Sequence, residues 1–164
     1  MGRSRPWLRL RRDALFFLAV GAVFVLDQLT KAIVRSNLAL GEAYPGEGIV
    51  RIVHVANSGA AFGILQGQTL FLTVTTLLGL AAILLYYLYP PMEHGLLRTA
   101  LGLQLGGAIG NLTDRIRLGE VTDFIDFRYW PAFNVADSAI VIGVSTIVIF
   151  FVFNETAWQR KKGA

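Results

Sequence analysis

Residues 14–34 read ALFFLAVGAVFVLDQLTKAIV, and only Asp27 and Lys31 among them carry a charge. A run of roughly 18 or more apolar residues is typical of a transmembrane helix, because a helix satisfies its own backbone hydrogen bonds where hydrocarbon offers no partner. At about 1.5 Å per residue, such a run crosses a hydrocarbon core of roughly 30 Å. The segment therefore predicts a helix that spans a membrane.

The rest of the chain repeats this pattern of long apolar runs. Hydrophobic residues make up 54% of the 164 residues and charged residues only 16%, against about 25% charged residues in an average soluble domain. Three further runs follow the first, at residues 69–89, 96–112 and 136–153. With no internal repeat and no domain boundary, the sequence predicts one all-α integral membrane domain over residues 1–164, with four transmembrane helices.

The basic residues are divided unevenly between the two ends of these predicted helices. Nine basic and three acidic residues lie on the side of the chain termini, and six basic and eight acidic residues lie on the side of the two long loops. An excess of Lys and Arg marks the cytoplasmic side, so we expect both termini in the cytoplasm and both long loops outside. The net charge of +4 is then a topology signal, and we expect no nucleic-acid partner.

A cleaved signal peptide is the competing interpretation of the basic N-terminus and the apolar run behind it. Asp27 and Lys31 interrupt that run, and no convincing small-residue cleavage site follows. Composition also disfavours metal and thiol chemistry. The chain has no cysteine, and His54 and His94 fall on opposite sides of the predicted membrane, so we expect no zinc site, no disulfide and no cofactor.

Two charged residues within the first predicted span need partners. Lys31 follows Asp27 by four residues, so both side chains lie on one face of a helix and can pair. Ionisable residues inside a span are energetically expensive and mark function by default. Two interpretations stay open: an ion pair that only neutralises charge and orients the helix, or a support for an active site nearby.

The third predicted span is the shortest and the richest in glycine. Gly102, Gly106 and Gly110 are spaced four residues apart, which lets other helices approach closely, and we expect them to serve packing. The helix is expected to end in a polar cluster at the outer surface. There Asp114 and Arg115 either cap the helix as an interfacial ion pair or support an active site.

Both long loops contain segments with a regular pattern. Residues 48–55 are rich in β-branched residues and bounded by glycine, which predicts a short strand pair in a small extracytoplasmic β element. In residues 119–127 two aspartates alternate with apolar residues, and Tyr129 and Trp130 follow. Tyr and Trp favour the membrane–water interface, so this pattern predicts an amphipathic interfacial segment lying along the membrane surface.

The start of the fourth predicted span adds another carboxylate. Asn134 is a good N-cap, and Asp137 follows three residues later as in a weak capping box. Asp137 also lies at the dry edge of an apolar helix, and the loop from Asp123 can fold back to bring the two carboxyls together. Two carboxyls in contact share a proton, so one can serve as base for water and the other as acid for a carbonyl oxygen, as in aspartyl proteases. Spacing alone assigns neither role, and it leaves Asp114 and Asp126 open as members of the pair.

Five short motifs occur along the chain: DQLTK at 27–31, NSGAAFG at 57–63, GNLTDR at 110–115, VTDF at 121–124 and FNVAD at 133–137. In this order they closely resemble the lipoprotein signal peptidase family of bacteria, also called signal peptidase II. The resemblance runs from about Asp27 to Ser138. One such motif would be weak evidence, but the set is highly specific.

The resemblance implies a four-helix enzyme of the bacterial cytoplasmic (inner) membrane with its active site on the extracytoplasmic face. The implied substrate is a prolipoprotein whose lipobox cysteine carries diacylglycerol, and the implied cut lies before that cysteine. Membrane lipid, globomycin-type peptide inhibitors and a monomeric state are expected as well, without metal or cofactor. The resemblance implies catalytic roles for Asp123 and Asp137. It implies substrate-binding or supporting roles for Asp27, Lys31, Asn57, Gly59, Asn111, Asp114, Arg115 and Asn134.

Two other functions stay open on the residues alone. A small proton-coupled transporter would also use Asp27 and Lys31, although four short helices without an inverted repeat make a poor one. A non-catalytic assembly subunit would use the glycines of the third helix to bind a partner helix. Substitution of Asp123 or Asp137 by Asn would abolish the activity of an enzyme and leave a structural subunit assembled.

Overall fold

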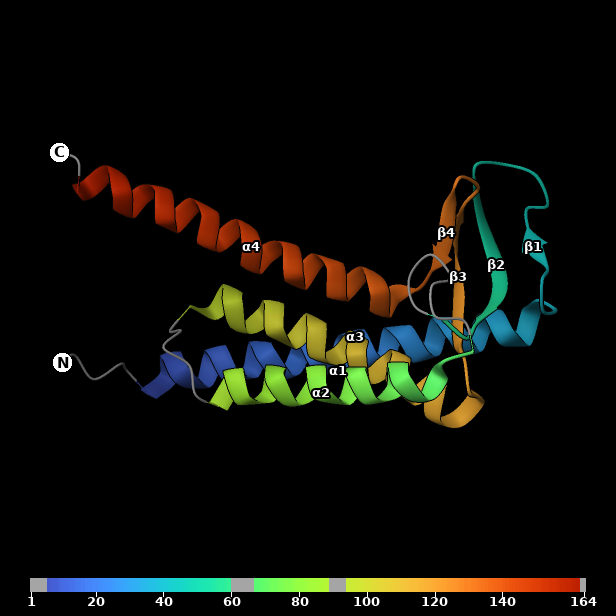
Figure 1. Cartoon of the computed structure of the whole chain (residues 1–164), viewed down its shortest axis with the longest axis horizontal. Helices are drawn as coiled ribbons and strands as arrows, with labels where there is room; N and C mark the ends of the chain where they lie inside the picture. The colour runs from blue at the N-terminus through green and yellow to red at the C-terminus, as the bar shows by residue number, and fades with distance from the viewer. Residues whose placement is uncertain (1–5, 60–66, 89–93, 163–164) are drawn as a thin grey trace.

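The computed structural model describes residues 6–59, 67–88 and 94–162. Within these ranges, four helices form a bundle and a small sheet closes one end of it (Figure 1). The start of the first helix and the end of the last lie at the end opposite the sheet. The helices are α1 (Pro6–Asn37), α2 (Thr69–Leu88), α3 (Gly95–Leu118) and α4 (Val135–Lys162), and the strands are β1 (Ala43–Tyr44), β2 (Val50–Asn57), β3 (Val121–Phe127) and β4 (Trp130–Phe133).

Each expected span lies within an observed helix, except that the last residue of the second span falls outside the described residues. α3 ends at Leu118 rather than at Leu112. Gly119 then takes a left-handed φ of 82°, and its N–H donates to the Arg115 carbonyl oxygen at 3.0 Å, which closes the helix. Asp114 and Arg115 therefore lie inside α3, and of the two interpretations left open for them the capping one is wrong.

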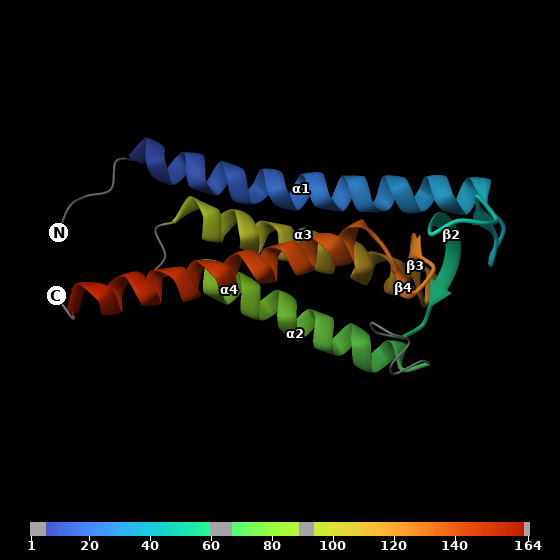
Figure 2. The same cartoon turned by 90° about the horizontal axis from the view of Figure 1, so that it is seen from above.

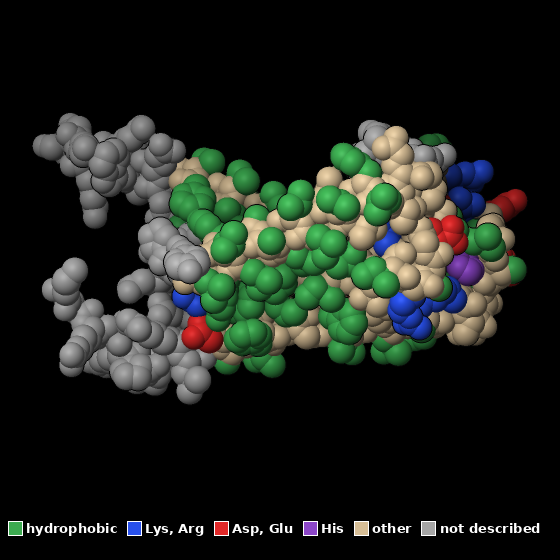
Figure 3. Space-filling model, turned by 60° about the horizontal axis from the view of Figure 1, so that its bottom comes forward, with side chains coloured by type: hydrophobic (Ala, Val, Ile, Leu, Met, Phe, Trp, Pro, Cys, Tyr) green, Lys and Arg blue, Asp and Glu red, His purple; other side chains and the backbone are tan. Residues whose placement is uncertain are grey.

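Three of the described helical segments are long and apolar enough to cross a membrane: Asp13–Asn37 of α1, the whole of α2, and Val135–Phe153 of α4. Hydrophobic side chains cover the side of the bundle seen in Figure 3, whereas charged side chains gather near its ends. A largely apolar surface of this kind suits lipid rather than water. The chain is therefore a membrane protein.

α3 is not one of these three segments, and its position in the bundle explains why. It contacts α1, α2 and α4 (Figure 2). Many residues of α3 are buried, whereas α2, all of whose residues are described, has a single buried residue, Leu72. A helix surrounded by other helices meets protein side chains instead of lipid, so its surface can include polar residues that a lipid-facing helix avoids.

Glycines on α3 allow the neighbouring helices to approach its backbone. A Cβ placed on Gly102 would lie 2.6 Å from the Phe16 carbonyl oxygen of α1, and one on Gly107 would lie 2.5 Å from the Ala136 carbonyl oxygen of α4. Real Cβ atoms do not come this close to backbone oxygen. The packing role expected for the glycines of the third span is therefore confirmed.

The sheet has the strand order β1-β2-β3-β4, and each neighbouring pair is antiparallel. Between β2 and β3, Val55 pairs with Asp123 and Asn57 pairs with Val121. Residues two apart on a strand share a face, so Asn57 and Asp123 are diagonal neighbours on the same side of the sheet. The register thereby brings together two polar side chains that lie 66 residues apart in sequence.

The expected β element is present, since β2 contains most of residues 48–55 and pairs with β1. Residues 121–127 of the expected interfacial segment form β3 of the same sheet. Alternation of carboxylates with apolar residues is also the period-two pattern of a strand. β3 lies between β2 and β4, which supply hydrogen-bond partners that a lone surface segment would have to find in water.

Replacing Gly106 by Ala is expected to lower the thermal unfolding midpoint in detergent. The added Cβ would lie 2.8 Å from the Val20 carbonyl oxygen and 3.0 Å from the Val23 Cβ, and overpacking of this kind costs about 1–3 kcal/mol. Gly21→Ala in α1 is the matched control, because nothing lies within 4 Å of its added Cβ and alanine is favoured over glycine in a helix by about 1 kcal/mol. Equal midpoints for the two variants would contradict the close packing of α1 on α3.

Candidate active site

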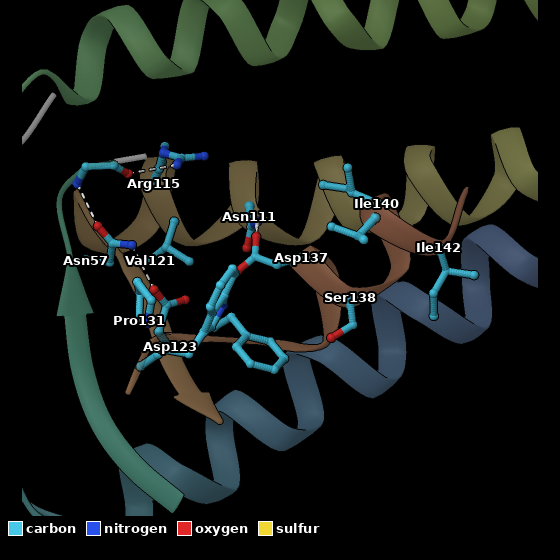
Figure 4. Close-up of a pocket in the computed structure, with 15 residues that line it drawn as sticks. Asn57, Asn111, Arg115, Val121, Asp123, Pro131, Asp137, Ser138, Ile140 and Ile142 are labelled. Atoms are coloured by element: carbon cyan, nitrogen blue, oxygen red, sulfur yellow. Dashed lines mark hydrogen bonds between the residues drawn. The ribbon is translucent and has the colours of Figure 1, made fainter. Parts of the chain in front are cut away.

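A cavity of about 620 Å³ lies at the sheet end of the bundle, beside the first turns of α4. The carboxyl groups of Asp123, from β3, and Asp137, from α4, both line it (Figure 4). The fold thus brings together the two aspartates that the sequence predicted as a pair. The other residues of the wall are Asn57, Gly59, Asn111, Arg115, Val121, Trp130, Pro131, Ala132, Phe133, Ser138, Ile140, Val141 and Ile142.

Two asparagine amides hold the Asp123 carboxyl. Asn57 Nδ2 donates to its Oδ2 at 2.8 Å, and Asn134 Nδ2 donates to its Oδ1 at 2.7 Å. Asp123 is only 2% exposed. Burial, together with the nearby charge of Asp137, raises the pKa of Asp123 to about 6, against the lowering effects of the two amides and of Lys31. Asp123 therefore keeps its proton at a higher pH than a solvated aspartate does.

Asp137 lies in the first turn of α4 and is bonded reciprocally to the N-cap residue. The Asp137 N–H donates to Asn134 Oδ1 at 2.9 Å, and the Asn134 N–H donates to Asp137 Oδ2 at 3.3 Å. The remaining oxygen, Oδ1, accepts from Asn111 Nδ2 at 2.8 Å. The capping interpretation of Asp137 is confirmed, and the same side chain also lines the cavity.

Asn134 and Asn111 connect the two carboxyl groups. Besides Asp123, Asn134 Nδ2 also reaches Asn111 Oδ1, at 3.2 Å. Asp123, Asn134, Asn111 and Asp137 therefore form one continuous chain of hydrogen bonds. Its donors are neutral amides, which orient a carboxyl without adding a full positive charge beside it.

A buried ion cluster lies behind this chain. The Lys31 ammonium is 2.9 Å from Asp27 Oδ2 and 3.3 Å from Asp114 Oδ2, and it donates to Asn111 Oδ1 at 2.9 Å. Lys31 and Asp27 have no exposed surface, and Asp114 is 1% exposed. The predicted pairing of Asp27 with Lys31 is confirmed. Through Asn111 the pair is also connected to Asp137.

The two aspartates that the sequence left open do not line the cavity. Asp126 accepts from Arg51 Nε at 2.8 Å across the β2–β3 pair, and Asp114 is bonded to Lys31 and to the Thr122 N–H. Among the residues whose positions are described, no three His, Cys, Asp or Glu side chains are grouped as metal ligands would be. The carboxyl groups on the cavity wall are those of Asp123 and Asp137.

Three residues of the ion cluster were missed from sequence: Gln28, Arg35 and Thr122. Gln28 Nε2 donates to Asp27 Oδ2 at 3.1 Å, to Asp114 Oδ1 at 3.2 Å and to a backbone carbonyl of α3. Arg35 Nη1 donates to Thr122 Oγ1 at 2.9 Å. A glutamine inside an apolar span was a usable signal, whereas nothing local to Arg35 indicates a partner on β3.

The edge of the cavity next to β2 is fixed by its own hydrogen bonds. Arg115 Nη2 donates to the Gly59 carbonyl oxygen at 3.4 Å, and the Gly59 N–H donates to Asn57 Oδ1 at 2.8 Å (Figure 4). Because its oxygen is engaged in this way, the Asn57 amide presents its NH2 group to Asp123. The rest of the predicted turn, residues 60–63, lies outside the described residues.

Comparison with known proteins places the chain among membrane peptidases. The family model described as signal peptidase (SPase) II matches residues 19–153. The chain belongs to the signal peptidase II family. The lipoprotein signal peptidase of Moorella thermoacetica is 46% identical over 130 residues, covering 79% of this chain and 87% of that protein. The lipoprotein signal peptidase of Halothermothrix orenii is 38% identical over 149 residues, covering 90% of this chain and 98% of that protein.

A solved structure of a bacterial membrane enzyme, obtained by the in meso method at 2.3 Å resolution, agrees with this fold at a TM-score of 0.82. It is 32% identical in sequence, over 87% of this chain and 90% of that one. Membership of the signal peptidase II family confirms the resemblance seen in the five motifs. It makes the chain an aspartic-type peptidase that removes lipoprotein signal peptides, and it sets aside the transporter and the assembly subunit.

The raised pKa of Asp123 predicts that stability depends on pH. The native state binds this proton more tightly than the unfolded chain does, so the contribution is fully present below pH ~4 and is lost as pH rises through about 6. Asparagine at this position does not titrate. We therefore expect the unfolding free energy of Asp123→Asn, relative to wild type, to rise by about 2 kcal/mol between pH ~4 and pH ~7.

Unfolding of both proteins in detergent at the two pH values measures this change. Any cost of the amide that is independent of pH cancels when the two values are compared. A relative stability that stays constant, or that falls with rising pH, would contradict the raised pKa.

Proposed function

We propose that the chain cuts diacylglyceryl-modified prolipoproteins before the lipidated cysteine, with Asp123 and Asp137 as its catalytic pair. Family membership supports the removal of lipoprotein signal peptides. The choice of these two residues rests on one observation. Both carboxyl groups line the same cavity, although they come from a strand and from a helix.

In the proposed reaction one carboxyl of the pair is protonated and the other is ionised, because two adjacent charged carboxylates repel each other. The ionised carboxyl takes a proton from water as the water oxygen bonds to the scissile carbonyl carbon, and the protonated carboxyl gives its proton to the carbonyl oxygen. On collapse the C–N bond breaks, the leaving nitrogen takes the proton that came from water, and the other proton returns to the pair. The acid and base roles belong to the pair as a whole.

The apolar wall of the cavity supports a substrate that carries lipid. Trp130, Phe133 and Ile140 line the cavity beside the carboxyl groups. The wall continues onto Val141 and Ile142 of α4, which are 63% and 55% exposed on the outer surface of the bundle. A substrate held by acyl chains in the membrane would therefore reach the carboxyl pair along an apolar surface without first entering water.

The proposed topology has all four helices, α3 included, crossing the bacterial cytoplasmic membrane. The carboxyl pair and the sheet lie at one end of the bundle, and the beginning of α1 and the end of α4 lie at the other (Figure 1). Since the basic residues cluster toward the chain termini, this arrangement supports cytoplasmic termini and an extracytoplasmic site. A monomeric enzyme that binds globomycin-type peptides in the cavity completes the proposal.

Asp123→Asn and Asp137→Asn are each expected to reduce cleavage of a diacylglyceryl-modified prolipoprotein by at least about 100-fold, because each removes a proton donor or acceptor of the reaction. The measurement is the initial rate of signal-peptide release by purified protein in detergent. Asp126→Asn is the matched control, since it neutralises a carboxylate on the same strand that pairs with Arg51 instead of lining the cavity. Its rate should stay within about threefold of wild type.

Retention of activity by both Asp123→Asn and Asp137→Asn would show that the pair is wrongly assigned, and Asp114 would be the next residue to substitute. If the wild-type protein leaves this substrate intact while an active relative cuts it under the same conditions, the proposed reaction is wrong.

A further inference from the structure

The backbone just ahead of each proposed catalytic aspartate is held by a different buried carboxylate. The Thr122 N–H, one residue before Asp123, donates to Asp114 Oδ2 at 3.1 Å. The Ala136 N–H, one residue before Asp137, donates to Asp27 Oδ1 at 3.0 Å. The two attachments come from different helices, since Asp27 belongs to α1 and Asp114 to α3.

Lys31 joins these two carboxylates to each other. Its ammonium lies 2.9 Å from Asp27 and 3.3 Å from Asp114. We call Lys31, Asp27 and Asp114 the lysine bracket. Gln28 supports it from the same helix, because its amide donates to a carboxylate oxygen of both Asp27 and Asp114.

The third bond of Lys31 acts on a catalytic carboxyl through one side chain. Lys31 donates to Asn111 Oδ1 at 2.9 Å. An ammonium can only donate, so this bond fixes which end of the Asn111 amide faces Lys31. The NH2 end is then directed at Asp137 Oδ1, 2.8 Å away.

We propose that Lys31 is a positioning residue, which sets the separation and orientation of the two catalytic aspartates through the lysine bracket and Asn111. The proposal rests on the carboxyl pair assigned above. Lys31 and its two carboxylates do not line the cavity, so the lysine acts on the reaction through the residues it holds. A compact ammonium with three donors suits this place, because it bonds three acceptors at once with no exposed surface.

The test compares two substitutions that change charge in opposite senses. Lys31→Met removes a positive charge from the bracket, and Asp27→Asn removes a negative one. Lys31→Met removes every bond that the ammonium makes. Asp27→Asn loses at least one bond of the bracket, because the asparagine has a single acceptor oxygen, whereas the carboxylate uses one oxygen for Ala136 and the other for Lys31. We expect kcat for the lipidated prolipoprotein, at each variant's own pH optimum, to fall by about 100-fold, the effect of a displacement of roughly 1 Å. KM should change by less than about threefold, because neither substituted residue lines the cavity.

An electrostatic effect without positioning would give a different result. The charged groups that act on Asp123 are Asp137 of α4, Lys31 of α1 and Arg115 of α3. Loss of the Lys31 cation would move the pH optimum upward and loss of the Asp27 anion would move it downward, each with maximal kcat retained. A fall of maximal kcat in both variants supports positioning, and opposite shifts of the optimum with full kcat overturn it.

Arg98→Met is the matched control for stability. Arg98 pairs with Asp13, so it also joins α3 to α1, but near the start of α3 and away from the cavity. We expect this variant to unfold at a lower temperature while its kcat and pH optimum match those of wild type. A kcat loss in Arg98→Met as large as that in the bracket variants would overturn the proposal, because any weakened α1–α3 contact would then suffice.

The outcomes separate this proposal from the one on which it rests. If Lys31→Met does not fold, Asp27→Asn decides the question, since Lys31 keeps Asp114 as a partner there. Wild-type kcat in folded Asp27→Asn overturns the positioning role and leaves the catalytic pair in place. A wild-type enzyme that does not cut the substrate overturns both.

Discussion

Burial of the Lys31 ammonium removes its hydration, a cost that is offset only when its N–H groups are paired with good acceptors. The acceptors come from α1 in the case of Asp27 and from α3 in the case of Asp114 and Asn111. The two carboxylates in turn accept backbone N–H groups from β3 and α4. The hydrogen bonds and ion pairs that compensate the buried ammonium therefore connect α1 and α3 to the sheet and to the start of α4.

Close contact of α1 with α3 is the condition for this arrangement. A Cβ on Gly110 would lie 2.5 Å from Asp27 Oδ2, so glycine at this position makes room for a carboxylate as well as for a helix. Gly102 and Gly106 hold the α1 backbone close along the preceding turns. The polar residues of α3 thus face protein inside the bundle, which accounts for a central helix that lacks the apolar composition of its neighbours.

Local patterns predicted the helices, because the length of an apolar run is a property of a short segment. They also indicated a carboxyl pair but left Asp114 and Asp126 open as its members, and the motif resemblance singled out Asp123 and Asp137. Contacts between distant segments were not predictable in this way. Asn57 meets Asp123 only through the register of β2 on β3, and Arg35 meets Thr122 across 87 residues. The pattern of residues 121–127 fits both a surface segment and a strand, and the pairing partners that decide between them lie elsewhere in the chain.

The side chains that bond the carboxyls of Asp123 and Asp137 are neutral amides, whereas the charged residues of the lysine bracket lie behind them. A cation in direct contact with a carboxylate lowers its pKa and favours the ionised form, which would work against a proton shared by the pair. The Asp123 oxygens instead accept from the amides of Asn57 and Asn134, and burial with the charge of Asp137 raises the pKa of Asp123 to about 6. The full charges of the lysine bracket thus hold the backbone from behind, while neutral amides hold the two carboxyls.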